Sequence, residues 1–127
     1  MTGLNLDHDV NLISLKQPDI NTLTKVQPHG VLLILQESDL TVLQVSTNTR
    51  IAFGLPPEEV LGKTLDDLLD SYQVDQFRAG LHYDNLDIMN PTKVWVRRRG
   101  DDYAVYDAIF HRNEQGFLIM ELEPALT

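Results

Sequence analysis

The histidines and acids of this chain are its candidates for acid–base and metal chemistry, and their spacing favours neither. The four histidines are His8, His29, His82 and His111. No two of them have the i,i+3 or i,i+4 spacing that brings two metal ligands onto one helix face. The clustered acids, at 58–59 and 66–67, stand at the starts of short predicted helices, where the helix dipole and water stabilise carboxylates. The pattern therefore predicts no metal site and no catalytic pair of carboxylates.

Nucleophilic and phosphate-binding motifs are also missing from the sequence. The chain contains no cysteine, which excludes disulfides, thiolate-bound zinc, iron–sulfur clusters and a thiol nucleophile within it. None of its serines lies in the Gly-x-Ser-x-Gly context of a nucleophile elbow. Its seven glycines are scattered rather than gathered in a phosphate-binding loop. We therefore expect this chain to have no enzymatic activity of its own.

The charge balance argues against nucleic acid and anionic membranes as partners. Ten lysines and arginines stand against 19 acids, a formal net charge of −9. Binding to phosphates requires clustered basic residues, and the one basic cluster, 97–99, is followed at once by Asp101 and Asp102. No apolar run approaches the roughly 20 residues of a membrane span, and the N-terminus lacks the pattern of a secretory signal. We expect a cytoplasmic protein.

The hydrophobic pattern predicts one α+β domain with helices between two groups of strands. Strands are predicted at 31–36, 41–46, 93–98, 103–111 and 117–123. Short helices broken by glycine and proline are predicted between Thr47 and Leu81. Residues 1–25 are expected to form an N-terminal arm with about one helical turn starting at Asp19 or Asn21, and residues 26–127 the domain. Five antiparallel strands with short helices on one side follow from this order.

One motif gives the domain a family resemblance. Gln27-Pro28-His29-Gly30 leads directly into the first predicted strand, and 44–48, 58–65, 100–103 and 121–124 accompany it at matching spacing. With these segments the chain resembles, over roughly residues 15–126, the N-terminal PAS domain of phytochromes, especially those of the cyanobacterial type. The resemblance implies the PAS fold: a five-stranded antiparallel sheet flanked by short helices.

The same resemblance implies a photosensory role as part of a longer protein, from which this chain would be an excised domain. In the family a GAF domain follows the PAS domain and holds a linear tetrapyrrole (bilin), and bacterial members commonly end in a histidine kinase of a two-component system. The segment before Gln-Pro-His-Gly threads through a loop of the GAF domain as a knot. The residues that would contact the GAF domain there are Ile20, Leu23, Val26, Gln27, Pro28 and His29. The first three would form an apolar plug, and Gln27 and His29 would hold the turn.

The missing cysteine also has a meaning within the family. Bacteriophytochromes attach their bilin to a cysteine in the arm, whereas the cyanobacterial type attaches it in the GAF domain. We therefore expect no chromophore attachment within this chain, a bilin in the GAF domain of the parent protein, and self-association of the isolated domain through the apolar surface that GAF would cover.

An alternative function is sensing of a small molecule between sheet and helices. The pocket would then be lined by Phe77, Trp95 and Tyr106, and His82 would be the axial ligand of a haem. Packing of these aromatic side chains in the core and on the sheet faces is the simpler interpretation.

Overall fold

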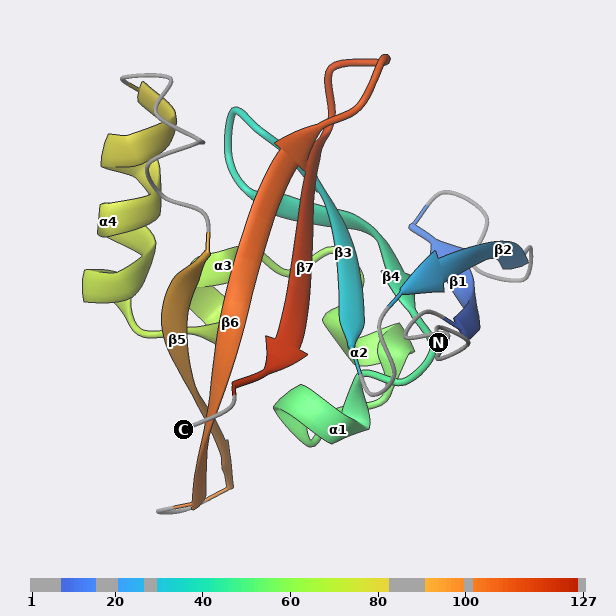
Figure 1. The fold of residues 1–127 in the computed structure, drawn as a ribbon, viewed down its shortest axis with the longest axis horizontal. Helices are drawn as coiled ribbons and strands as arrows, with labels where there is room; N and C mark the ends of the chain where they lie inside the picture. Colours follow the sequence, from blue (N-terminus) through green and yellow to red (C-terminus); the bar gives the residue numbers. More distant parts are fainter. Residues whose placement is uncertain (1–7, 16–20, 27–29, 83–90, 100–101, 126–127) are drawn as a thin grey trace, which may run out of the picture.

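The computed structural model describes residues 8–15, 21–26, 30–82, 91–99 and 102–125. Its strands form one antiparallel sheet in the order β2-β1-β4-β3-β7-β6-β5 (Figure 1). The strands are β1 (His8–Ser14), β2 (Asn21–Val26), β3 (Val31–Gln36), β4 (Thr41–Ser46), β5 (Thr92–Arg99), β6 (Asp102–Arg112) and β7 (Leu118–Pro124). The five strands predicted from the sequence are the contiguous block from β4 to β5.

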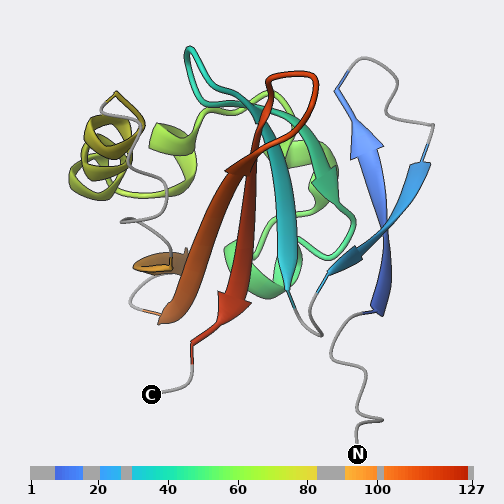
Figure 2. The ribbon, with the colours of Figure 1, turned by 45° about the horizontal axis from the view of Figure 1, so that its top comes forward.

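Four short helices lie between β4 and β5 in the sequence and cover one face of the sheet (Figure 2). They are α1 (Arg50–Phe53), α2 (Pro57–Val60), α3 (Leu65–Leu68) and α4 (Ser71–His82). Gly54 ends α1 with a left-handed φ of 70° and lies against the backbone of Arg98 in β5. A β-carbon there would come within 3.3 Å of the Arg98 carbonyl oxygen, so a glycine lets α1 approach the sheet.

The core lies between the helices and this face of the sheet. Alternate residues of the strands point into it, such as Tyr106, Ala108 and Phe110 of β6, all buried. From the helical side Phe77 of α4 packs on Phe110, with ring centroids 5.0 Å apart and an interplanar angle of 58°. This tilted arrangement is one that aromatic pairs prefer.

The predicted helical turn in the N-terminal segment is wrong. Residues 21–26 form β2, which pairs with β1, and β1 pairs in turn with β4 through Leu12, Ile13 and Ser14. Three β-branched residues at alternate positions, Thr22, Thr24 and Val26, favour an extended chain over a helix. The sheet thereby gains two strands beyond the five expected. The division into an arm, 1–25, and a domain, 26–127, stays a prediction.

One position at the β5 edge of the sheet, Trp95, is paired by a side chain. Gln73 of α4 is 8% exposed and pairs with the backbone of Trp95 as a neighbouring strand would. The Trp95 N–H donates to Gln73 Oε1 at 2.7 Å, and Gln73 Nε2 donates to the Trp95 carbonyl at 2.9 Å. Nε2 also donates to Asp70 Oδ2 at 3.0 Å. Because unpaired edge strands invite pairing with other chains, this contact protects the edge as well as holding α4.

Candidate functional site

The first part of the candidate site is the anchor that receives the chain after residues 27–29. Asn48 Nδ2 donates to the Gly30 carbonyl at 2.7 Å, and the Ser46 hydroxyl donates to Asn48 Oδ1 at 2.5 Å. The N–H of Leu32 donates to the Ser46 oxygen at 3.0 Å. Ser46 is fully buried, so its hydroxyl depends on these partners. The end of β4 thus fixes the position at which the Gln-Pro-His-Gly segment enters β3.

The second part is β1, which β4 and the residue after it, Thr47, hold in place. The N–H of Thr47 donates to the Asn11 carbonyl at 2.8 Å, and the N–H of Leu15 donates to the Leu43 carbonyl at 2.6 Å. Leu12 of β1 is 4% exposed and packs on Leu32 of β3. These contacts join β1 to the sheet next to the anchor.

The third part is apolar surface on the face of the sheet opposite the helices. Ile34 alternates with the core residues Leu33 and Leu35 and therefore points away from the helices. It packs, with Ile119 of β7, against the cluster formed by Leu12 and Leu32. A solvated sheet face ordinarily presents polar side chains, so these apolar residues set this part of the face apart from the usual pattern.

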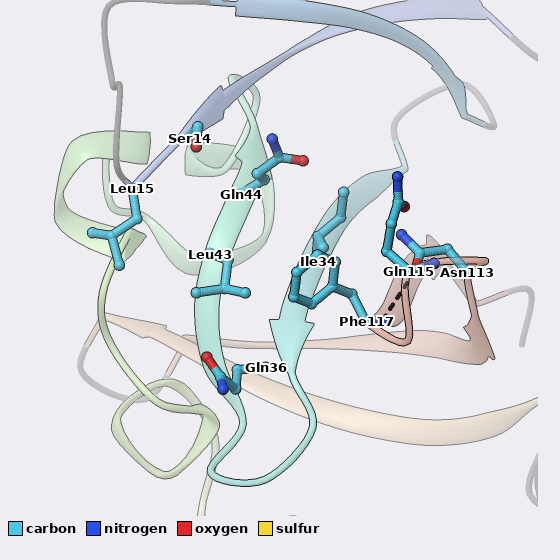
Figure 3. Close-up of a pocket in the computed structure, with 9 residues that line it drawn as sticks. All are labelled: Ser14, Leu15, Ile34, Gln36, Leu43, Gln44, Asn113, Gln115 and Phe117. Carbon is cyan, nitrogen blue, oxygen red and sulfur yellow. Dashed lines mark hydrogen bonds between the residues drawn. The ribbon is translucent and has the colours of Figure 1, made fainter.

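A hollow adjoins this surface, and we call it the arm-side hollow. Its volume is about 370 Å³. Figure 3 shows that its walls come from the end of β1, from β3 and β4, and from the turn between β6 and β7. The lining residues are Ser14, Leu15, Ile34, Gln36, Leu43, Gln44, Asn113, Gln115 and Phe117. Leu15 and Phe117 are 40% and 38% exposed, which is much apolar surface to leave in water.

The lining of the arm-side hollow suits binding rather than catalysis. None of its nine residues carries a formal charge or titrates near neutral pH. Its amide side chains, such as Gln36, Gln44 and Gln115, can both donate and accept hydrogen bonds. Neutral donors and acceptors beside apolar groups lose little on desolvation, because no charge must leave water. The hollow can therefore accept an uncharged protein surface at low cost.

The predicted knot residues are only partly placed by the structure. Ile20, Gln27, Pro28 and His29 lie outside the described residues. Leu23 and Val26 are in β2, where their backbones stand opposite Asn11 and His8 of β1. Contact of these six residues with a GAF domain stays a prediction.

The four residues of the alternative pocket are not brought together. Phe77 lies in the core, and Tyr106 is 4% exposed with its hydroxyl donating to the Ile51 carbonyl at 3.2 Å. Trp95 is 52% exposed and lines a hollow beside α3, whereas His82, exposed at the end of α4, lines a different one. A ligand pocket built from these four residues stays a prediction without support from their positions.

Ionisable groups elsewhere serve structure. Burial raises the pKa of the Tyr106 phenol, and the positive charge of Arg98 opposes this rise. Arg112 of β6 binds Glu37 through two hydrogen bonds, of 2.7 and 2.8 Å, which join the two turns at one end of the sheet. Within the described ranges no three acidic or histidine side chains gather as a metal site would require. No helix among these residues is long and apolar enough to cross a membrane.

The sequence interpretation missed the anchor and the arm-side hollow. The anchor has a local signal, because Ser46 and Asn48 are small polar residues directly after a buried strand, where side chains bond to nearby backbone. The arm-side hollow has no local signal in the sequence, because its lining residues Leu15, Leu43 and Phe117 come from three distant segments.

Comparisons with known proteins agree with this fold. The PAS fold family matches residues 15–125. Cyanobacterial phytochrome A of Nostoc sp. is 54% identical over 119 residues, which are 94% of this chain and 16% of that protein. Phytochrome-like protein Cph1 of Synechocystis sp. is 43% identical, again over 94% of this chain and 16% of that protein. The resemblance to the PAS domain of cyanobacterial phytochromes is confirmed.

Solved structures agree as well. The chromophore binding domain of Stigmatella aurantiaca phytochrome P1 superposes with a TM-score of 0.71 and 36% identity, covering 80% of this chain and 33% of that chain. The chromophore-binding domain of the bacteriophytochrome RpBphP3 from R. palustris gives 0.67 and 28%, covering 80% of this chain and 32% of that one. This chain therefore spans about a sixth of the length of its curated relatives and a third of these structures.

Proposed function

This chain belongs to the PAS fold family, and from that premise we propose that it is the N-terminal PAS domain of a phytochrome-like light sensor. In this proposal a GAF domain of the same polypeptide carries a linear tetrapyrrole, and this domain braces it. In this proposal the work of the domain is mechanical, and the chain has no cysteine to which a pigment could be attached. The parent protein would be a cytoplasmic sensor histidine kinase, with its kinase far from this chain.

The observation that carries the proposal is the uncharged, partly apolar face beside the anchor. Leu15, Ile34 and Phe117 leave apolar surface in water, and the amides around them can pair with backbone groups of a partner. Interfaces between domains of one chain resemble transient protein–protein interfaces, in which apolar and neutral polar groups occur together. A neighbouring domain of the same polypeptide fits this requirement, because it is always present and can keep the apolar surface out of water.

The anchor is a second observation in favour of the proposed knot. Asn48 and Ser46 fix the backbone from Gly30 to Leu32, so the preceding residues 27–29 start from a defined point. A rigid start lowers the entropy lost when the segment at 20–26 is held in a partner's loop. In this proposal Val26, with Ile20 and Leu23, fills that loop as an apolar plug.

Introduction of a charge on the face tests the docking. In the parent protein Phe117→Asp should lower pigment incorporation and photoconversion, because an unpaired carboxylate in an apolar contact is costly. Ile51→Asp is the matched control, since Ile51 is also 38% exposed but lies in α1 on the helical face. The proposal predicts that the control keeps the spectrum. Equal spectra for both variants and the wild type would contradict the docking face.

Two further tests address the plug and the pigment. Val26→Asp in the parent protein should weaken pigment incorporation or photoconversion for the same reason, and an unchanged spectrum would argue against the plug. The 127-residue chain alone should bind no bilin covalently. A zinc-fluorescent band that survives denaturation on a gel would contradict this expectation.

A further inference from the structure

Exposed aromatic side chains gather at the opposite edge of the sheet from β1 and β2. Trp95 and Tyr103, on β5 and β6, are each 52% exposed. They are two of the six large apolar side chains exposed within the described part of the chain, and Leu15 and Phe117 of the arm-side hollow are two others. Large exposed apolar residues therefore mark two separate surfaces.

A second hollow, of about 280 Å³, lies at this edge, and we call it the β5-edge hollow. Its apolar lining comes from Leu68 and Leu69 at the end of α3 and from the two aromatic rings, Trp95 and Tyr103. Unlike the arm-side hollow, it also has charges of both signs. Asp67 and Asp70 line it together with Arg97.

Contacts within the chain involve Arg97, Tyr103 and the backbone of Trp95 at the β5-edge hollow. Arg97 Nε donates to the Tyr103 hydroxyl at 3.2 Å, and its guanidinium carbon lies 5.5 Å from the centroid of the Tyr103 ring. Gln73 fixes the backbone of Trp95 through two hydrogen bonds. Preorganised aromatic and arginine side chains are the residues most often found to dominate binding energy at interfaces.

We infer that the β5-edge hollow is a self-association surface, and that its occupant is the same surface of a second copy of this chain. A two-fold interface requires a patch that is complementary to itself. A patch with Arg97 beside Asp67 meets this requirement, because a two-fold axis through the hollow pairs each Arg97 with the carboxylates of the other copy. The aromatic rings would meet across the axis.

Charge supports a second copy over a purely acidic or basic partner. An acidic partner would face Asp67 and Asp70, and a basic one would face Arg97. Two chains of net charge −9 repel each other, so a dimer needs local ion pairs to offset that repulsion. Because the β5 edge is at the other end of the strand order from β1 and β2, a second copy and a neighbouring domain can bind at the same time.

Sedimentation velocity of the purified chain over a hundredfold concentration range tests the inference. The wild type should shift from monomer towards dimer, and Trp95→Ala should weaken the association about tenfold or more, as expected for a central aromatic residue. Ile51→Asp should leave it unchanged, because Ile51 lies in α1 and does not line the β5-edge hollow. A wild type that stays monomeric throughout the range would overturn the inference.

A charge swap between two chains gives the sharpest test. Arg97→Glu and Asp67→Lys should each weaken self-association, since each variant carries like charges at positions 67 and 97, which face each other across the axis. An equimolar mixture of the two should recover the dimer, because positions 67 and 97 again carry opposite charges across the axis. Asp67 accepts a hydrogen bond from the Thr64 N–H at 3.1 Å, so circular dichroism must show that the Asp67→Lys variant is folded. The Arg97→Glu and Trp95→Ala variants leave that hydrogen bond intact and test the surface independently.

Other results would separate this inference from the proposed function. A dimer that survives Trp95→Ala and Arg97→Glu but is lost in Phe117→Asp would show association through the arm-side face, and would overturn the β5-edge assignment alone. Failure of the mixture to recover the dimer, with both variants folded, would overturn the two-fold pairing. Neither result bears on pigment incorporation in the parent protein, which tests the docking of the GAF domain.

Discussion

Removal of the Asn48 side chain is the perturbation that tests the anchor most directly. Asn48→Ala eliminates two hydrogen bonds, the 2.7 Å bond to the Gly30 carbonyl and the 2.5 Å bond from the Ser46 hydroxyl. Gly30 and Ser46 are buried, so neither finds a full replacement in water. The substitution therefore removes two favourable contacts and leaves two buried polar groups with fewer partners.

The expected cost follows from these two contacts. A typical hydrogen bond contributes about 1 kcal/mol net, and a buried group left unsatisfied costs about 1–3 kcal/mol. Asn48 itself is only half-buried, so water can enter the space that its side chain leaves. We expect the free energy of unfolding to fall by about 2–3 kcal/mol for Asn48→Ala.

Urea denaturation followed by far-UV circular dichroism measures this loss. Thr47→Ala is the matched control, because Thr47 stands between Ser46 and Asn48 and its side chain is exposed; its cost should stay within about 0.5 kcal/mol. Asn48→Asp should cost an intermediate amount, since it keeps an acceptor for Ser46 but loses the donor to Gly30. A double-mutant cycle with Ser46→Ala should give a coupling energy of about 1 kcal/mol.

Two results would refute this reasoning about the anchor. An Asn48→Ala variant as stable as the Thr47→Ala control would show that these hydrogen bonds contribute nothing. Strict additivity of Ser46→Ala and Asn48→Ala would show that the two side chains do not act together.

Three other substitutions have defined outcomes. Gln73→Ala should lower the free energy of unfolding by about 1–3 kcal/mol in urea denaturation, because Trp95 loses both backbone partners at an edge strand, and the exposed Gln76→Ala should be neutral; equal stabilities would contradict this role. Leu40 is buried at a left-handed φ of 58°, so Leu40→Gly, which relieves the strain, should be no less stable than Leu40→Ala, reversing the usual order; a clearly less stable glycine variant would exclude strain there. Because the pKa of Tyr106 is raised, the folded state keeps the phenol proton to higher pH than the unfolded state does. The contribution of Tyr106 to the free energy of unfolding is therefore complete below the ordinary pKa of 10.0 and is lost as the pH rises through the folded-state pKa. Stability measured by denaturation from pH 9 to pH 11 should therefore fall more steeply for the wild type than for Tyr106→Phe, and parallel slopes would contradict it.

The parts of the fold that could be predicted from sequence have local signals. The apolar run of β3 and the two-residue period of β5, β6 and β7 mark strands wherever side chains alternate between core and surface. Gly54 marks the end of α1 because its positive φ favours glycine. The motif Gln27-Pro28-His29-Gly30 indicated the family, because it is rare and stands directly before a strand.

The remaining features depend on contacts between distant residues. The strand pairing of β1 with β4 needs Leu12 to reach Leu32, which no local pattern shows. Gln73 appears from its sequence to be an ordinary helix residue, and only the position of α4 beside β5 makes its amide a substitute for a strand. The two hollows likewise arise from separate segments, so no local pattern groups the residues that line each of them.

The central claim is that a neighbouring domain covers the sheet face opposite the helices, beside the arm-side hollow. NMR of isoleucine δ1 methyl groups tests this claim most directly. Spectra of the 127-residue chain are compared with spectra of the longer protein that contains it. The account predicts that Ile34 and Ile119, which pack together on the face opposite the helices, change their chemical shifts and lose contact with water. Ile51, exposed in α1 on the helical face, should keep its shift. Unchanged signals for Ile34 and Ile119 in the longer protein would contradict the account.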